Sequence, residues 1–108
     1  MYYTYIIRCI DNSLYIGITS DIVRRMFEHK EKGKKCAKYT KVHGFKNLEC
    51  YFLSSDRKLA SRLEYHLKRL TKRQKEKIVR DGDFVSYLSN FKNSDYFFVR
   101  SFNKGTGE

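Results

Sequence analysis

The N-terminal residues 2–18 predict a β-hairpin, and this hairpin is the strongest constraint on the fold. Residues 2–10 are rich in aromatic and β-branched side chains, which favour extended strands. The Asp-Asn-Ser sequence at 11–13 supplies short polar side chains that stabilise tight turns. Residues 14–18 are then the return strand. A hairpin at the start of the chain favours an antiparallel sheet.

Two tyrosines and one glycine are expected on the same face of this hairpin. If the turn centres near Asn12, residues of equal parity face each other, which places Tyr5, Tyr15 and Gly17 together. Gly17 has no side chain, so we expect a shallow gap beside the tyrosines that a backbone or ligand can approach. A strand tyrosine is more often a half-buried core residue. It takes part in catalysis only when its surroundings adjust its pKa or hold it against a proton that must move.

A first helix is predicted after the hairpin. Ser20 is its expected N-cap, and the helix extends to about Glu31. Arg25 and His29 are four residues apart, so they project from one face. That face is either solvated, or it uses arginine to hold a phosphate and histidine to exchange protons. The expected apolar stripe of this helix consists of Ile22, Val23, Met26 and Phe27.

Residues 30–41 contain six lysines and no sustained periodicity, so they predict a basic loop that ends in Tyr39 and Thr40. Residues 47–54 predict a third strand. Residues 55–56 cap a second helix over about 57–70.

Glu64 lies within the apolar stripe of this second helix, four residues after Ala60 and three before Leu67. A buried carboxylate requires compensation, because an unpaired buried charge is costly. Either Glu64 forms a salt bridge with Lys68 or a basic loop, or it binds a metal ion. Mg²⁺ is often held by one or two carboxylates, with water and substrate phosphate as its remaining ligands.

The C-terminal third predicts one clear helix and weaker elements. Thr71 begins a capping-box sequence, so a helix is expected from there to Asp81, with Gly82 as its stop. Residues 83–90 suggest another short helix, and residues 96–102 a late strand or an ordered tail. Residues 103–108 are expected to fray.

The composition indicates a single basic domain with a polyanionic partner. The chain has 108 residues and a net charge of +11, from 23 Lys and Arg against 12 Asp and Glu. The basic residues gather at 30–41 and at 68–80, which suits contacts to a phosphate backbone. Three cysteines with irregular spacing suggest reduced thiols in a cytoplasmic protein. No apolar run approaches about 18 residues, so we expect no membrane association.

Taken together, these residues resemble the GIY-YIG nuclease superfamily, and in particular its small stand-alone bacterial members. The sequence Thr-Tyr-Ile at 4–6 stands at the first signature triplet, and Tyr-Ile-Gly at 15–17 is an intact second triplet. Further matches are Asp21, Arg24 with Arg25, and His29, then Ala-Lys-Tyr-Thr at 37–40 and Arg-Leu-Glu at 62–64. The resemblance covers about residues 2–80.

The resemblance implies an α+β fold, with a three-stranded antiparallel β-sheet flanked by three to four α-helices. It implies a catalytic domain over 1–90, followed by an extension over 91–108 that packs on the domain or trails from it. The implied activity is Mg²⁺- or Mn²⁺-dependent hydrolysis of DNA phosphodiesters with a single ion. The implied catalytic set is Tyr5, Tyr15, Arg25, His29 and Glu64, with Glu64 as the metal ligand; the expected substrate contacts are Gly17, Lys38, Tyr39, Thr40, Lys68 and Lys72.

Within that resemblance, Tyr5 helps to deprotonate the attacking water, Tyr15 shapes the site or shares that role, and Arg25 holds the scissile phosphate. His29 assists proton transfer. Three departures stand out. Tyr3 replaces the glycine of the first triplet. The late asparagine of larger relatives has no match, since Asn90 and Asn93 lie too far along the chain. The usual proline of the basic loop is absent, with Phe45 or Lys46 nearby.

The sequence therefore predicts a metal-dependent DNA endonuclease, either structure-selective or weakly sequence-specific and of the repair or recombination type. A recruiting protein partner is compatible with this prediction, and the oligomeric state is open. The first alternative is a non-catalytic nucleic-acid-binding protein on the same scaffold. The second is a basic adaptor for a protein or ribosomal partner.

Overall fold

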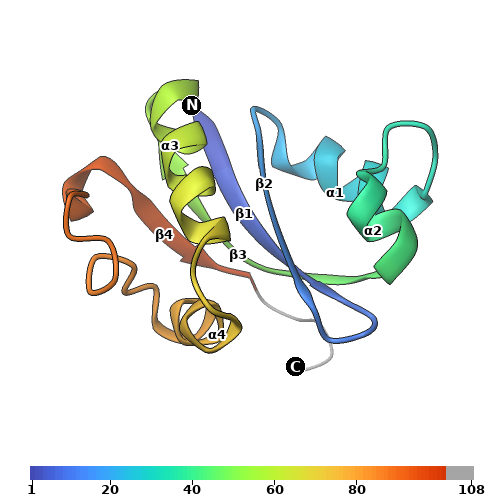
Figure 1. Cartoon of the computed structure of the whole chain (residues 1–108). Coiled ribbons are helices and arrows are strands. Elements are labelled where there is room, and N and C mark those ends of the chain that lie inside the picture. Colours follow the sequence, from blue (N-terminus) through green and yellow to red (C-terminus); the bar gives the residue numbers. More distant parts are fainter. Residues whose placement is uncertain (102–108) are drawn as a thin grey trace.

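The computed structural model describes residues 1–101, which form a four-stranded antiparallel sheet with helices on both faces (Figure 1). The α+β class predicted from the sequence is confirmed. The sheet order is β2-β1-β3-β4, so a fourth strand joins the three that were expected. The elements in chain order are β1 (Tyr2–Cys9), β2 (Leu14–Thr19), α1 (Ile22–Glu31), α2 (Lys38–His43), β3 (Phe45–Ser54), α3 (Arg57–Lys68), α4 (Lys72–Asp81), a 3₁₀ turn (Asn93–Asp95) and β4 (Phe97–Arg100).

The hairpin has the register predicted from its turn. Tyr5 pairs with Gly17 and Ile7 pairs with Tyr15, so residues of equal parity share a face. Asn12 adopts a positive φ of 73°, a conformation that asparagine tolerates better than most residues. The two signature tyrosines and Gly17 therefore lie on the same side of the sheet.

The two faces of the sheet pack against different helices. Ile6 and Ile16 face α3 and α4, where they join a core with Phe52, Leu63 and Ile78. The opposite face carries Tyr5, Ile7 and Cys9, against which Ile22 and Met26 of α1 pack. Figure 1 shows α1 and α2 to the right of β2 and α3 to its left, and the sheet separates these two helical layers.

The helix starts follow the predicted capping chemistry with one correction. Asp56 caps α3, and Thr71 and Gln74 form the expected capping box of α4, with Gly82 in the left-handed conformation at its end. The expected N-cap of α1, Ser20, is wrong, because the Asp21 side chain accepts the hydrogen bond from the Arg24 amide at 3.1 Å. Asp and Ser are similarly favoured at the N-cap position, so the observed cap lies one residue after the predicted one.

The apolar stripe predicted for α1 is only half right. Ile22 and Met26 pack inward, but Val23 and Phe27 are 78% and 61% exposed. The third inward position belongs to His29, which is fully buried. The buried face of α1 therefore includes a polar residue, His29, about one turn after Met26. The pattern of apolar residues alone predicted a different buried face.

Part of the predicted basic loop is helical. Residues 38–43 form α2, which starts at Ala37 without a side-chain cap and ends at Gly44 with a positive φ of 81°. No apolar periodicity marks this helix, because its inward side chain is a threonine, Thr40. A helix of six residues whose buried residue is a threonine leaves no apolar pattern in the sequence.

Three boundaries also differ from the prediction. Strand β3 begins at Phe45 rather than at Asn47, and helix α3 ends at Lys68 rather than at Leu70. Residues 83–90 are not a helix: they form turns around Phe84, which is 1% exposed and packs in the core. The predicted late strand is β4, whereas Phe102 and residues 103–108 lie outside the described residues.

Candidate active site

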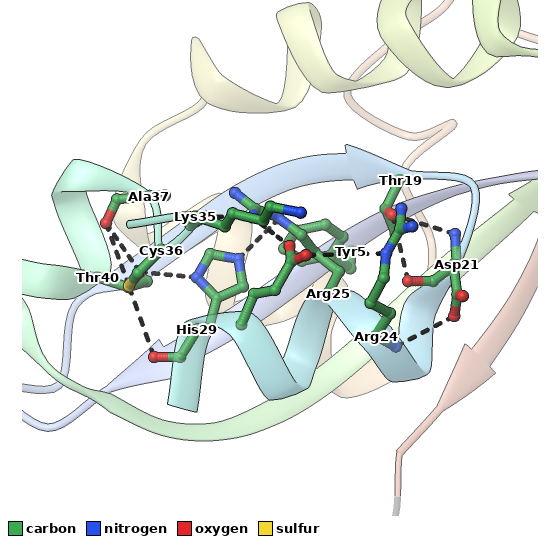
Figure 2. Close-up of polar contacts among 11 residues, drawn as sticks. Tyr5, Thr19, Asp21, Arg24, Arg25, His29, Lys35, Cys36, Ala37 and Thr40 are labelled. Carbon is green, nitrogen blue, oxygen red and sulfur yellow. Dashed lines mark hydrogen bonds and ion pairs between the residues drawn. The ribbon is translucent and has the colours of Figure 1, made fainter. Parts of the chain in front are cut away.

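The hydroxyl of Tyr5 lies at the centre of a buried polar network between β1, α1 and α2 (Figure 2). It lies 2.9 Å from Nε2 of His29, and it accepts a hydrogen bond from Nε of Arg25 at 3.3 Å. Tyr5 and His29 are 1% and 0% exposed. The arginine and the histidine are four residues apart on α1, so one helix face reaches the same hydroxyl with both side chains.

His29 is held from behind by α2. Its Nδ1 lies 2.7 Å from the hydroxyl of Thr40, and that hydroxyl donates to the Ala37 carbonyl at 3.2 Å. A hydroxyl has one proton to donate, so the Thr40 oxygen accepts from Nδ1–H of the histidine. Nε2 of the neutral ring is then an acceptor, and the Tyr5 hydroxyl donates to it. Figure 2 shows this series of contacts from Arg25 through His29 to Thr40.

Burial sets the protonation states of this pair. Desolvation raises the pKa of Tyr5 well above its ordinary value; the Arg25 hydrogen bond opposes the shift, and the nearby Tyr15 and Glu64 add to it. Desolvation, together with the charge of Arg25, lowers the pKa of His29 to about 4. Near neutral pH the tyrosine is therefore protonated and the histidine is neutral. A neutral imidazole next to a hydroxyl proton is a potential proton acceptor.

Arg25 is oriented by two further partners. Its Nη1 donates to Glu28 at 2.8 Å and to the backbone carbonyl of Lys35 at 2.6 Å. The side chain is 21% exposed, so part of the guanidinium reaches solvent. The neighbouring Arg24 is 63% exposed and lies 3.8 Å from Glu28. Of the two adjacent arginines, only Arg25 contacts the tyrosine.

Gly17 accommodates Tyr5 rather than a ligand. A Cβ atom placed on Gly17 would lie 2.6 Å from Cζ of Tyr5, even closer to its hydroxyl, and 3.1 Å from the Tyr15 ring. The gap expected at this glycine is therefore filled by the end of the Tyr5 side chain. Because Gly17 has no side chain, the Tyr5 side chain can lie across strand β2 towards α1.

Tyr15 lies between the two helical layers. Its ring centroid is 5.5 Å from that of His29, 6.3 Å from that of Tyr5 and 5.6 Å from that of Tyr39. From the other side, Nζ of Lys68 on α3 lies 5.8 Å from the Tyr15 ring centroid. Tyr15 is thus the point where side chains from α1, α2 and α3 meet.

Glu64 is a partly exposed carboxylate at the margin of the α3 core. Its side chain is 22% exposed and pairs with Nζ of Lys68 at 3.2 Å, so the salt bridge considered from the sequence is present. Its charge acts on Tyr5, which places it near the polar network. Within residues 1–101 no cluster of three or more His, Cys, Asp or Glu side chains is suited to a metal. One carboxylate facing solvent fits an ion that keeps most of its water, as Mg²⁺ does.

The predicted substrate contacts divide into exposed and buried residues. Lys38 and Tyr39 on α2 are exposed, as is Lys68. Lys72 is also exposed and donates to the Asn12 carbonyl at 2.8 Å. Thr40 is fully buried, and the contact found for it is with His29.

Sequence reasoning missed several supporting groups. Cys36 is buried, with its sulfur 3.2 Å from the Thr40 hydroxyl, and the Phe45 ring stacks on His29 with centroids 6.4 Å apart. The carbonyl of Lys35 also belongs to the site. A backbone acceptor leaves no trace in sequence. The only available signal was the Ala-Lys-Tyr-Thr motif, which marks where α2 meets α1.

The fold brings the two hairpin tyrosines close to an arginine and a histidine of the next helix. Comparison with known families identifies the class of protein that has this arrangement. Residues 1–77 match the family model described as the GIY-YIG catalytic domain. The chain therefore belongs to the GIY-YIG family, as its signature residues predicted, and this family is one of nucleases. None of the helices within residues 1–101 is long and apolar enough to cross a membrane.

Similar proteins come from bacteria. A "UPF0213 protein" of Citrobacter koseri is 45% identical over 84% of this chain and 90% of its own length. The "UPF0213 protein YhbQ" of Salmonella typhimurium is 42% identical over the same shares. A solution NMR structure of a UPF0213 protein from Bacillus halodurans is 36% identical, covers 85% of this chain and 98% of its own, and has a TM-score of 0.48.

Proposed function

We propose that the protein is a metal-dependent DNA endonuclease that hydrolyses phosphodiester bonds. The single observation that carries this proposal is the Tyr5 hydroxyl, which contacts both Arg25 and a neutral His29. This arrangement combines a proton acceptor with a cation whose donors suit a phosphate. Family membership supports nuclease chemistry, and the basic charge supports a nucleic-acid substrate.

The proton pathway follows the hydrogen bonds of the network. A water attacks phosphorus as its proton passes to the Tyr5 oxygen, while the Tyr5 proton passes to Nε2 of His29. The phosphorus–oxygen bond to the leaving nucleotide breaks, and that oxygen keeps the electron pair and takes a proton from solvent. After the reaction, His29 returns its extra proton to the Tyr5 oxygen along the same hydrogen bond, and Tyr5 releases the proton it took from water. Because Tyr5 exchanges one proton for another, no free tyrosinate accumulates, which agrees with its raised pKa.

Three side chains divide the remaining work. Arg25 binds the scissile phosphate with the part of its guanidinium that reaches solvent, and Glu28 and the Lys35 carbonyl fix its orientation. Glu64 would hold a single Mg²⁺ or Mn²⁺ once its pairing with Lys68 is released. When bound, such an ion stabilises the negative charge that develops on the phosphate. Tyr15 shapes the site between these groups.

We also propose that cutting is structure-selective or weakly sequence-specific, of the repair or recombination type. The exposed lysines 38, 68 and 72 present ammonium groups, which contact phosphates and carry little sequence information.

One observation favours a second candidate, a DNA-binding protein without cleavage. Glu64 already pairs with Lys68, and no second carboxylate within residues 1–101 joins it in a metal cluster. If this pair persisted with DNA bound, no ion would be held. Lysine contacts alone would then give salt-sensitive binding without hydrolysis.

Cleavage of a panel of labelled DNAs separates the two candidates. The panel contains blunt duplex, nicked, 5′-flap and single-stranded DNA, each with and without Mg²⁺ or Mn²⁺. We expect metal-dependent products from the wild-type protein and at least a 100-fold lower rate in Glu64→Gln and Arg25→Ala. The matched controls are Glu31→Gln and Arg24→Ala, exposed residues of α1. Binding to every DNA without metal-dependent cleavage of any would establish the second candidate.

A further inference from the structure

A hollow of about 270 Å³ lies beside Tyr15 at the edge strand β2, and its lining comes from β2, α2, α3 and α4. It is lined by Leu14, Tyr15, Ile16, Tyr39, Lys68 and Lys75. Of these residues, the reaction proposed above uses Tyr15 to shape the site and Lys68 as a phosphate contact and as the partner of Glu64. The hollow is an additional site next to the catalytic network.

One wall of the hollow is aromatic and held in place by ring stacking. Tyr39 stacks between two rings, with its centroid 5.6 Å from that of Tyr15 and 4.1 Å from that of His43. His43 in turn bonds to Asp11 in the β1–β2 turn, so α2 is anchored to the hairpin. Tyr39 remains 36% exposed despite this stacking. Because its two faces are covered by Tyr15 and His43, Tyr39 presents its exposed edge, which is fixed in position and can contact a planar base at little entropic cost.

The opposite wall is cationic. Nζ of Lys68 lies over the Tyr15 ring, and Lys75 from α4 lines the same hollow. Desolvation and the charge of Lys68 both lower the pKa of Lys75, so the two ammonium groups lie near each other. Lys68 pairs with Glu64, whereas Lys75 has no salt bridge within the described part of the chain. Two neighbouring cations, of which one is paired with a carboxylate, leave a net positive charge that can attract an anion.

An aromatic wall, two aliphatic side chains and a pair of cations match the parts of a nucleotide. We propose that this hollow binds one unpaired nucleotide of the DNA, with its base against Tyr15 and Tyr39 and its phosphate between Lys68 and Lys75. The proposal rests on the proposed function and specifies its substrate class. A base in a continuous duplex is stacked on its neighbours and must be unstacked before it can enter, which costs free energy. The hollow therefore selects DNA with a flap, gap or single-stranded end.

The position of the hollow links this selection to cleavage. Tyr15 lines the hollow with one part of its ring and contacts the Tyr5–His29 network with another. Lys68 lines it as well and pairs with Glu64. A nucleotide bound here lies beside the network and draws Lys68 towards its own phosphate. That contact weakens the Lys68–Glu64 pair and frees the carboxylate for a metal ion.

Binding measured without metal tests the proposal independently of cleavage. Fluorescence anisotropy in EDTA gives the dissociation constants of the full chain for a 5′-flap DNA and for a blunt duplex of the same length. We expect the flap to bind about tenfold more tightly, since the duplex cannot bring a base against the two tyrosine rings or its phosphate between the two lysines without unstacking. A 2-aminopurine in the flap should be quenched on binding. In Tyr39→Ala the tenfold preference and the quenching should be lost, while duplex affinity changes less than threefold.

Three variants control for folding and for general charge. Tyr39→Phe keeps the ring and should keep the preference. Tyr65→Ala removes a tyrosine that is 58% exposed on α3 outside the hollow, and it should have no effect. Lys75→Gln should weaken flap binding more than Lys58→Gln, which removes a charge outside the hollow. Equal affinity of the wild-type protein for flap and duplex, or equal losses for both DNAs in Tyr39→Ala, would overturn the proposal.

Failure of this proposal and failure of the proposed function are distinguishable. Metal-dependent cleavage with no Tyr39-dependent preference means that the protein is a nuclease without this nucleotide site. A Tyr39-dependent preference without cleavage of any DNA means that the site serves binding alone and that the endonuclease assignment is wrong.

Discussion

The Tyr5 hydroxyl and Nε2 of His29 lie 2.9 Å apart, in a part of the molecule from which water is almost fully excluded. Neither group is in its usual setting, since burial raises the pKa of the tyrosine and lowers that of the histidine. The pair favours the neutral forms on both sides. In the proposed mechanism a proton moves along this existing hydrogen bond, so neither side chain carries a charge before the reaction.

The first prediction concerns the coupling of these two side chains. Tyr5→Phe and His29→Gln should each lower the single-turnover cleavage rate by about 100-fold to 10,000-fold, the range typical of general acid–base groups. Because the two act in one proton pathway, the double variant should be no slower than the slower single variant. Tyr65→Phe is the control. Multiplicative losses in the double variant would show that the residues act separately.

Gly17 provides a test based on packing alone. In Gly17→Ala the new methyl group would displace the end of Tyr5, so we expect a loss of about 1–3 kcal/mol in the free energy of unfolding and a large loss of cleavage. Gly33→Ala is the matched control, since a Cβ there meets no atom within 4 Å. Urea denaturation and cleavage assays measure both effects. Equal behaviour of the two variants would mean that Tyr5 does not need its position across β2.

The low pKa of His29 predicts a specific pH dependence of stability. An unfolded histidine binds its proton near pH 6.5, whereas burial and the Arg25 charge lower the pKa of folded His29 to about 4. Its contribution is therefore fully present above about pH 6.5 and is lost as the pH falls towards 4. Between pH 7 and 5 the wild-type protein should lose about 2 kcal/mol more than His29→Gln in urea denaturation. Identical slopes would show that His29 titrates normally.

A second buried polar group supports the fold away from the site. Arg8 is 12% exposed and donates to Glu49 at 2.8 Å and to Glu76 at 2.7 Å, which ties β1 to β3 and α4. Arg8→Gln leaves Glu49 without its cation and Glu76 with Lys72 alone, and it should lower the free energy of unfolding by about 2–4 kcal/mol. The exposed Arg24→Gln should change it by less than about 0.5 kcal/mol. Thermal denaturation of both variants measures these losses of stability. Equal losses in the two variants would contradict the expectation.

The parts of the fold that follow from local chemistry were predictable. The hairpin register depended on the turn at Asn12 and on the parity of strand residues, and the capping box at Thr71 on one short motif. Helical spacing predicted that Arg25 and His29 share one face of α1, whereas their gathering around Tyr5 was implied by the family resemblance.

Features that depend on tertiary contacts were not predictable. Helix α2 has no apolar pattern, since polar contacts hold it in place: Thr40 bonds to His29 and His43 bonds to Asp11. The space above Gly17 looked open from the sequence, yet the Tyr5 side chain fills it. Residues 83–90 had helical composition, but the burial of Phe84 between strands and α3 outweighed the propensity.

The central claim is that Glu64 makes this polar network a metal-dependent nuclease site. The most direct measurement is the single-turnover cleavage rate of one labelled 5′-flap DNA across a Mg²⁺ titration, for the wild-type protein and for Glu64→Gln. We expect a rate that saturates with Mg²⁺ in the wild-type protein and is at least 100-fold lower in the folded variant at every concentration. Equal rates in the two proteins, or no cleavage by the wild-type protein at any Mg²⁺ or Mn²⁺ concentration, would contradict it.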